Sequence, residues 1–276
     1  MEINILNDDC LLQIFAHLSL NDVLNLEFVC LRWKKIHQQI CNQQTTIKIF
    51  ENKSTLTSFF YCETIYFNQL QCCSFFESVN DYLIISKLDW SMCRLLASKF
   101  CNIKMLLIYG CHISKSVLLE FLLFQWKQLR CLSLIHLMGN VCWRELLSCL
   151  DTLPQLKHLS LFGVDDELKL PNVLPQLEQF QLGRYEHSLL QVLTQLGSQI
   201  RVLGLYDSNL TISCLSEVAN LNNTIKHQVT YLAIKSDVLK QTTAERSLLQ
   251  FVCFNLNFLT CLELFTEQGV NSSSKN

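Results

Sequence analysis

Residues 129–137 read LRCLSLIHL, and the same arrangement of apolar residues returns at residues 156–164 as LKHLSLFGV. In both stretches the first, fourth, sixth and ninth residues are apolar. A β-strand points alternate side chains to one face, so the fourth and sixth residues would lie on the same face. Each stretch therefore predicts a short strand with two or three inward apolar residues.

The pattern recurs along most of the chain. Its second apolar residue advances in steps of 26, 27, 21, 23, 29 and 30 residues. The residues at this position are Leu106, Leu132, Leu159, Phe180, Leu203, Leu232 and Leu262. Weaker copies precede them at Cys62, Ile65 and Phe67 and at Ile85, Leu88 and Trp90, and Ile47 and Ile49 open the series. Such self-similarity is typical of repeat proteins, in which each unit buries its apolar face against its neighbours.

The segments between the strands carry helix signals. Ser114 precedes apolar residues at helical spacing, and Thr242 and Glu245 form a capping box. Residues 165–175 contain two prolines, so no full helix is expected there. These features resemble the leucine-rich-repeat family over residues 44–268. The resemblance implies an α/β fold, a curved solenoid with parallel strands on its concave face. A generic α/β sheet protein is the alternative.

The first forty residues have helical rather than strand periodicity. Asn7 is placed to cap a helix, and Asp8 and Asp9 favour its first turn. Two apolar stripes follow at helical spacing, first Leu11, Ile14, Phe15 and Leu18, then Val23, Leu26, Val29, Trp33 and Ile36. Domains under about 40 residues usually need a staple or a partner, because they cannot bury enough apolar surface alone. Part of the stripe is therefore expected to meet another protein.

This segment resembles the F-box. The run from Ile5 to Leu18 resembles its opening, with Asn7 where the family usually has Pro, and residues 29–33 resemble its Val-Cys-x-x-Trp core. The resemblance implies a three-helix F-box at residues 1–43 that binds the Skp adaptor of SCF-type ubiquitin ligases. The residues expected to bind the adaptor are Leu6, Leu11, Ile14, Phe15, Leu18, Val23, Leu26, Val29 and Trp33.

The combination of an F-box with leucine-rich repeats resembles the substrate-recognition subunits of these ligases. It implies a non-catalytic subunit that links an unidentified target protein to the adaptor and a cullin, for ubiquitination and proteasomal degradation. A leucine-rich-repeat interaction scaffold without ligase assembly is the alternative. Adaptor binding distinguishes the two functions.

The residue after the third apolar position of each repeat indicates a target surface. This column reads Tyr109, Ile135, Phe162, Gly183, Tyr206, Lys235 and Phe265. On a concave face these side chains would be exposed beside smaller ones, and exposed aromatic anchors are typical of binding hot spots. Tyr109, Phe162, Tyr206 and Phe265 are therefore predicted to bind the target. The alternative is that the rings pack on one another and stiffen the sheet.

Charge and cysteine usage bear on other kinds of site. The net charge is -2, with 22 basic and 24 acidic residues, so neither nucleic acid nor a membrane is an expected partner, despite Lys34 and Lys35 beside Trp33. The fifteen cysteines include no C-x-x-C pair, so no metal site is expected. They are expected to be buried thiols in a reducing compartment.

The sequence also predicts where the protein acts and whether it is an enzyme. No signal peptide or apolar stretch long enough to span a membrane is found, so a cytoplasmic and/or nuclear location is expected. No catalytic or cofactor-binding motif occurs, so neither enzyme activity nor a cofactor is expected. Residues 269–276 are expected to form a disordered tail.

Overall fold

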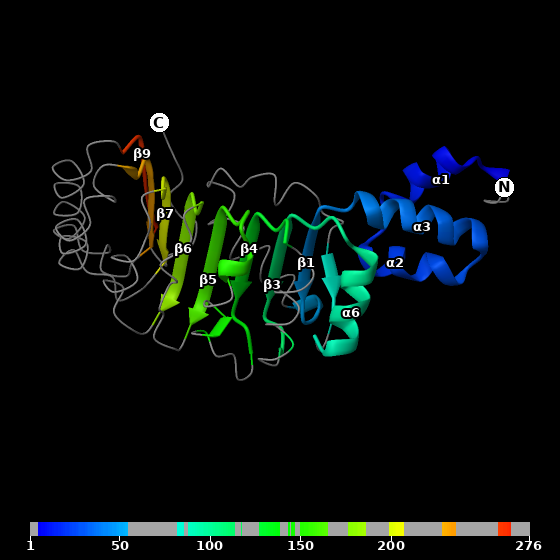
Figure 1. The fold of residues 1–276 in the computed structure, drawn as a ribbon, viewed down its shortest axis with the longest axis horizontal. Helices are drawn as coiled ribbons and strands as arrows, with labels where there is room; N and C mark the ends of the chain where they lie inside the picture. The colour runs from blue at the N-terminus through cyan, green and yellow to red at the C-terminus, as the bar shows by residue number, and fades with distance from the viewer. Residues whose placement is uncertain are drawn as a thin grey trace, which may run out of the picture. The chain divides into compact units, whose positions relative to one another are not determined.

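The computed structural model describes residues 5–54, 82–85, 88–113, 117, 127–138, 143, 145–146, 150–164, 176–185, 199–206, 228–235 and 259–265. Helices at the N-terminal end are followed by parallel strands, which is an α/β arrangement (Figure 1). The chain divides into two compact units, residues 1–141 with 152–155 and residues 142–151 with 156–276. Each unit contains its own set of paired parallel strands.

Three α-helices open the first unit, and the first of them begins directly after Asn7, as that capping residue predicts. They are α1 (Asp8–Phe15), α2 (Leu20–Asn25) and α3 (Leu31–Gln43). The Asn7 side chain accepts a hydrogen bond from the Cys10 backbone N–H at 2.8 Å, and Ser19 accepts one from the Asp22 N–H at 3.3 Å. Each bond satisfies a backbone donor that the first turn of a helix leaves unpaired. Asn7, which stands where the F-box usually has proline, therefore still caps the helix.

The continuous helical spacing expected from Val23 through Trp33 is wrong. Helix α2 passes into the 3-10 helix η2 (Leu26–Phe28), and Cys30 is extended, with φ -163° and ψ 167°. Cys30 is the residue before α3, so the chain changes direction there. The apolar residues from Val23 to Ile36 consequently do not form one continuous helical stripe.

Four parallel strands follow in the first unit, in the order β2-β1-β3-β4. Their bounds are β1 (Thr46–Phe50), β2 (Tyr82–Ile84), β3 (Met105–Tyr109) and β4 (Cys131–Ile135). Ile47, Leu106 and Leu132 align across β1, β3 and β4, and so do Ile49, Ile108 and Leu134. All six side chains are fully buried, which confirms the inward apolar columns. Because β2 lies outside β1, the first two strands do not follow sequence order.

The weaker copy expected at Ile85, Leu88 and Trp90 is wrong. The strand in this region is β2, and Trp90 instead begins helix α6 (Trp90–Lys99). The Asp89 side chain caps this helix by accepting a hydrogen bond from the Met92 N–H at 3.0 Å. The local capping signal thus prevails over the apolar spacing. The copy at residues 62–67, the helix signals at 114 and 242–245, and the proline segment 165–175 lie outside the described residues.

A hydrogen bond links α2 to the edge of this sheet. The Ile85 N–H donates to the Phe50 carbonyl of β1 at 2.8 Å, whereas the preceding N–H, of Ile84, donates to the Asn21 side chain at 3.3 Å. Backbone donors of a strand alternate in direction, so the Ile84 N–H faces away from β1. Asn21 therefore pairs a donor that an edge strand would otherwise leave exposed.

Two further contacts link the helices to the rest of the first unit. The Asn102 side chain donates a hydrogen bond to the Asn42 carbonyl at the end of α3, at 2.7 Å. Lys99, at the end of α6, forms an ion pair with Glu27 of η2. The N-terminal helices are thus held by neighbours from two separate parts of the sequence, Ile84 and residues 99–102.

The described residues of the second unit form five parallel strands in sequence order. Their bounds are β5 (His158–Val164), β6 (Gln179–Tyr185), β7 (Val202–Tyr206), β8 (Tyr231–Lys235) and β9 (Cys261–Phe265). Leu159, Phe180, Leu203 and Leu232 align across β5 to β8, as do Leu161, Leu182, Leu205 and Ile234. These side chains are buried. The seven clear copies of the sequence pattern therefore each form a strand, β3 to β9.

Aromatic rings lie over glycines on the other face of the second unit. The rings of Phe162 and Tyr206 stack with centroids 5.5 Å apart and an interplanar angle of 25°. Between them in the strand register is Gly183, where an added Cβ would overlap Cδ1 of Phe162. Because Gly183 has no side chain, there is room for the ring of Phe162 above it.

Gly183→Ala is expected to destabilise the protein by about 1–3 kcal/mol, because the ring of Phe162 must move from its place beside Tyr206. Urea unfolding would measure the loss. In a Phe162→Leu background the same glycine change should cost much less, since the ring is gone. An equal cost in both backgrounds would contradict the steric explanation.

Candidate adaptor-binding surface

The N-terminal helices enclose a small apolar core. Leu11, Phe15, Leu26 and Ile36 are buried in it, and Leu6, Leu12, Leu18, Trp33 and Ile40 pack against it partly exposed. The rings of Phe15 and Trp33 meet edge to face, with centroids 4.7 Å apart. Of the residues predicted to bind the adaptor, Leu11, Phe15, Val23 and Leu26 are buried, and Leu6, Leu18 and Trp33 are half-buried. As placed here, these seven residues build the helical module rather than its outer surface.

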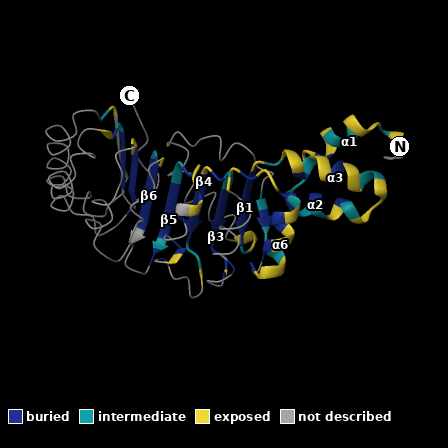
Figure 2. Cartoon of the chain, in the orientation of Figure 1, coloured by how far each residue is buried: buried dark blue, intermediate teal, exposed yellow. Residues whose placement is uncertain are grey.

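A set of large apolar side chains remains exposed on these helices. Leu31, Phe28, Ile5, Val29 and Ile14 are 81%, 79%, 75%, 57% and 42% exposed. Five of the eight large apolar side chains exposed in the described part of the chain belong to this set, and its first four members are the most exposed of all. The exposed residues of α1, α2 and α3 are visible in Figure 2. Soluble proteins rarely expose apolar side chains in such density without a binding role.

The break at Cys30 explains why the set is exposed. The single 3-10 turn of η2 buries Leu26 and leaves Phe28 and Val29 outside. After the extended Cys30, α3 begins with Leu31 on its outer side. Ile14 and Val29 were expected at the adaptor surface, whereas Ile5, Phe28 and Leu31 were missed because helical spacing assumes no break. The high proportion of apolar residues in 26–31 is the sequence signal that could have indicated these exposed side chains.

Arg32 joins the start of α1 to the start of α3. Its Nε lies 2.7 Å from Oδ1 of Asp8, and its guanidinium also donates to the Leu6 carbonyl. The ion pair is largely exposed, so its contribution to stability is small. Its structural effect is to hold the segment of Leu6 and Asp8 beside the start of α3.

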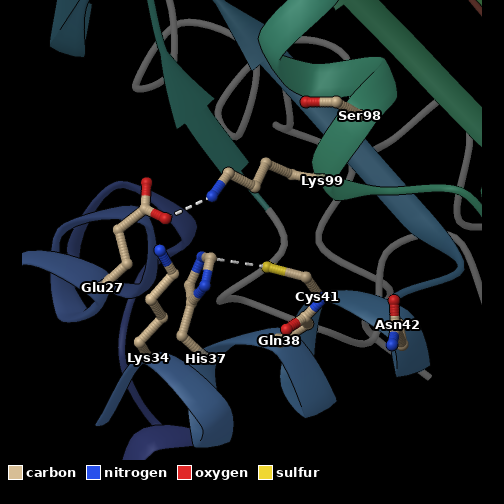
Figure 3. A pocket seen from close by; sticks show the side chains of 8 residues that line it. All are labelled: Glu27, Lys34, His37, Gln38, Cys41, Asn42, Ser98 and Lys99. Atoms are coloured by element: carbon tan, nitrogen blue, oxygen red, sulfur yellow. Dashed lines mark hydrogen bonds and ion pairs between the residues drawn. The ribbon is translucent and has the colours of Figure 1, made fainter. Parts of the chain in front are cut away.

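A cavity of about 240 Å³ lies between α3 and α6, beside this surface (Figure 3). Its lining residues are Glu27, Lys34, His37, Gln38, Cys41, Asn42, Ser98 and Lys99. The hydrogen bond from Lys99 lowers the pKa of Glu27, and burial lowers the pKa of His37. Glu27 is therefore charged and His37 neutral at pH 7.

Cys41 is the second buried group of the cavity. Its Sγ lies 3.2 Å from Nε2 of His37, and burial raises the pKa of the thiol to about 12. A Cys–His nucleophile requires a thiolate, which this environment disfavours. The pair is therefore a buried contact between two neutral groups within α3.

Three of the four aromatic residues predicted to bind the target are buried. Tyr109, Phe162 and Tyr206 are 8%, 4% and 5% exposed, so the expectation of an exposed aromatic row is wrong for these three residues. Tyr109 packs against Phe50 and His136, with ring centroids 5.9 and 5.8 Å away, and Phe162 stacks on Tyr206. Neighbouring strands are only about 4.8 Å apart, so large rings on adjacent strands meet each other. Phe162 and Tyr206 lie two strands apart and meet over Gly183, which has no side chain. Phe265 lies in β9, and its side chain lies outside the described residues.

Metal-binding clusters and membrane-spanning helices are absent from the described residues. They contain no group of three or more His, Cys, Asp or Glu side chains placed to hold a metal ion. None of the helices seen in the described part of the chain is long and apolar enough to cross a membrane.

Comparison with known families identifies the N-terminal helices. Residues 3–36 match the F-box domain. The match contains α1, α2, η2 and the first part of α3, together with the five exposed apolar residues. F-box domains typically bind the Skp adaptor. No curated protein matches the chain.

Acidification is expected to destabilise the protein. Because the pKa of His37 is lowered in the fold, the unfolded chain takes up a proton first as the pH falls below about 6.5, and the free energy of unfolding decreases from there. His37→Gln should therefore reduce the pH dependence of the urea midpoint between pH 7 and 5. His158, whose pKa burial also lowers, should leave a residual slope.

The exposed His17 provides the matched control. His17→Gln should keep the pH dependence of the unmodified protein, since its side chain is not buried in the fold. A slope in His37→Gln that equals the slope of the unmodified protein would contradict the assignment to His37.

Proposed function

We propose that the chain is the substrate-recognition subunit of an SCF-type ubiquitin ligase, in which residues 1–43 bind the Skp adaptor. The main support for this proposal is that two features occupy the same segment of the chain. The segment that matches the F-box holds most of the exposed large apolar side chains among the described residues. An adaptor that covers Ile5, Ile14, Phe28, Val29 and Leu31 gives these side chains a physical reason to be outside.

The size of the exposed set is adequate for binding. Full burial of one large apolar side chain contributes about 1.5–3 kcal/mol. Association costs about 4–15 kcal/mol in lost freedom, so most of the set must be covered at once to give useful affinity. The buried core of Leu11, Phe15 and Leu26 contributes indirectly, by holding the outer residues in place.

The double change Phe28→Asp with Leu31→Asp is expected to abolish co-purification of the adaptor. Both side chains are exposed, so the helices should still fold, which circular dichroism would verify. Met138→Asp is the matched control, because Met138 is an exposed apolar residue outside the F-box match. Retention of the adaptor by the double variant would overturn the proposed surface.

We assign residues 44–268 to a leucine-rich-repeat domain, a curved solenoid whose concave face captures the target, with 269–276 as a tail. Support comes from the repeated apolar pairs, which align in register across β3 and β4 in the first unit and across β5 to β9 in the second. Target contact by Tyr109, Phe162, Tyr206 and Phe265 stays a prediction. For the three buried rings, contact would be limited to the edges that remain accessible.

In this proposal the chain has no catalytic activity, uses no cofactor and acts in the cytoplasm or nucleus. Ubiquitin transfer to a bound target should require the adaptor, a cullin, a RING protein and a conjugating enzyme together. A reconstituted assay that omits one component at a time measures this. Transfer by the purified chain with a conjugating enzyme alone would overturn it. A scaffold without ligase assembly would instead fail to bind the adaptor.

A further inference from the structure

The cavity between α3 and α6 is rich in hydrogen-bond donors and carries excess positive charge. Lys34 and Lys99 supply two ammonium groups, and Glu27 supplies the one carboxylate. Lys99 already forms an ion pair with Glu27, whereas Lys34 forms no ion pair with any described residue. Figure 3 shows Lys34 and His37 on the α3 side of the cavity and Lys99 on the α6 side.

The polar lining is accessible from solvent. Lys34, Gln38, Asn42 and Ser98 are all exposed, although His37 and Cys41 at the inner end are buried. Amide, hydroxyl and ammonium groups around a positively charged hollow favour an anionic oxygen ligand over an apolar group or a cation. Carboxylate is the form in which proteins most readily supply such oxygens.

The cavity adjoins the exposed apolar set. Glu27 immediately precedes Phe28 and Val29, and Lys34 lies three residues after Leu31 on α3. Residues three apart on a helix lie on the same side, so Leu31 and Lys34 are neighbours on the surface. A protein that covers Phe28, Val29 and Leu31 therefore also reaches the mouth of the cavity.

We propose that the cavity receives an aspartate or glutamate side chain of the adaptor, with Lys34 as the paired cation and Gln38 and Asn42 as supporting amide donors. This inference rests on the proposed function, because it requires the adaptor to dock on the F-box. It adds a charged anchor to an otherwise apolar interface, and such anchors fix the register of two surfaces and speed their encounter.

The test compares two adjacent lysines of α3 in the full-length chain. Lys34 lines the cavity, whereas Lys35 is also exposed and is not part of its lining. Isothermal titration with purified adaptor should give about fivefold weaker binding for Lys34→Gln and a larger loss for Lys34→Glu. Lys35→Glu should stay within about twofold of the unmodified chain. The salt dependence of binding should also become weaker in Lys34→Gln, since an ion pair is lost.

A charge exchange identifies the carboxylate. One Asp→Lys or Glu→Lys variant of the adaptor should restore binding to the Lys34→Glu chain. Full affinity of Lys34→Glu, an equal loss in Lys35→Glu, or failure of every adaptor variant to restore binding would each overturn the inference. The double variant Phe28→Asp with Leu31→Asp separates this inference from the proposed function. If the double variant loses adaptor binding, the proposed function stands even when the cavity inference is overturned. If the double variant still binds the adaptor, the proposed function is overturned as well.

Discussion

In-register pairing of parallel strands is the constraint on which the sheet of each unit depends. A shift of one residue would turn every inward leucine to the opposite face, so the apolar pair of each strand must meet the pair of the next. Ile47 against Leu106 in the first unit and Leu159 against Phe180 in the second show the same alignment. The connecting segments do not enter this alignment, which explains how successive strands can be separated by steps that vary from 21 to 30 residues.

The strands and the first three helices were predictable because their signals are local and strong. An apolar pair with period two and a capping residue such as Asn7 or Ser19 each act over a few residues. Trp90 was misplaced because apolar spacing was weighed without the Asp89 cap. Burial of Tyr109 and Phe162 could not be read from alternation alone, since a large ring on one strand lies over its neighbour, as the contact of Phe162 with Gly183 demonstrates. Exposure of Phe28, Val29 and Leu31 depends on the extended backbone of Cys30, which the helical spacing of the sequence did not predict.

The F-box segment uses apolar residues for two purposes. Leu11, Phe15 and Leu26 are removed from water within the module, whereas Phe28 and Leu31 stay in water. Periodicity groups these residues together because they have the same chemistry. The change of direction between η2 and α3 separates them, and it also brings α3 against α6, where the polar cavity forms.

The hydrogen bond between Asn21 and the Ile84 N–H limits how this protein can be cut and recombined. A chimera joined at residue 43 would receive foreign helices without the amide at position 21, and β2 would then present an unpaired donor at a sheet edge. Exposed edges of this kind recruit strands from other molecules. Exchange of the N-terminal helices between related proteins would therefore carry a risk of aggregation that a map of sequence domains does not reveal.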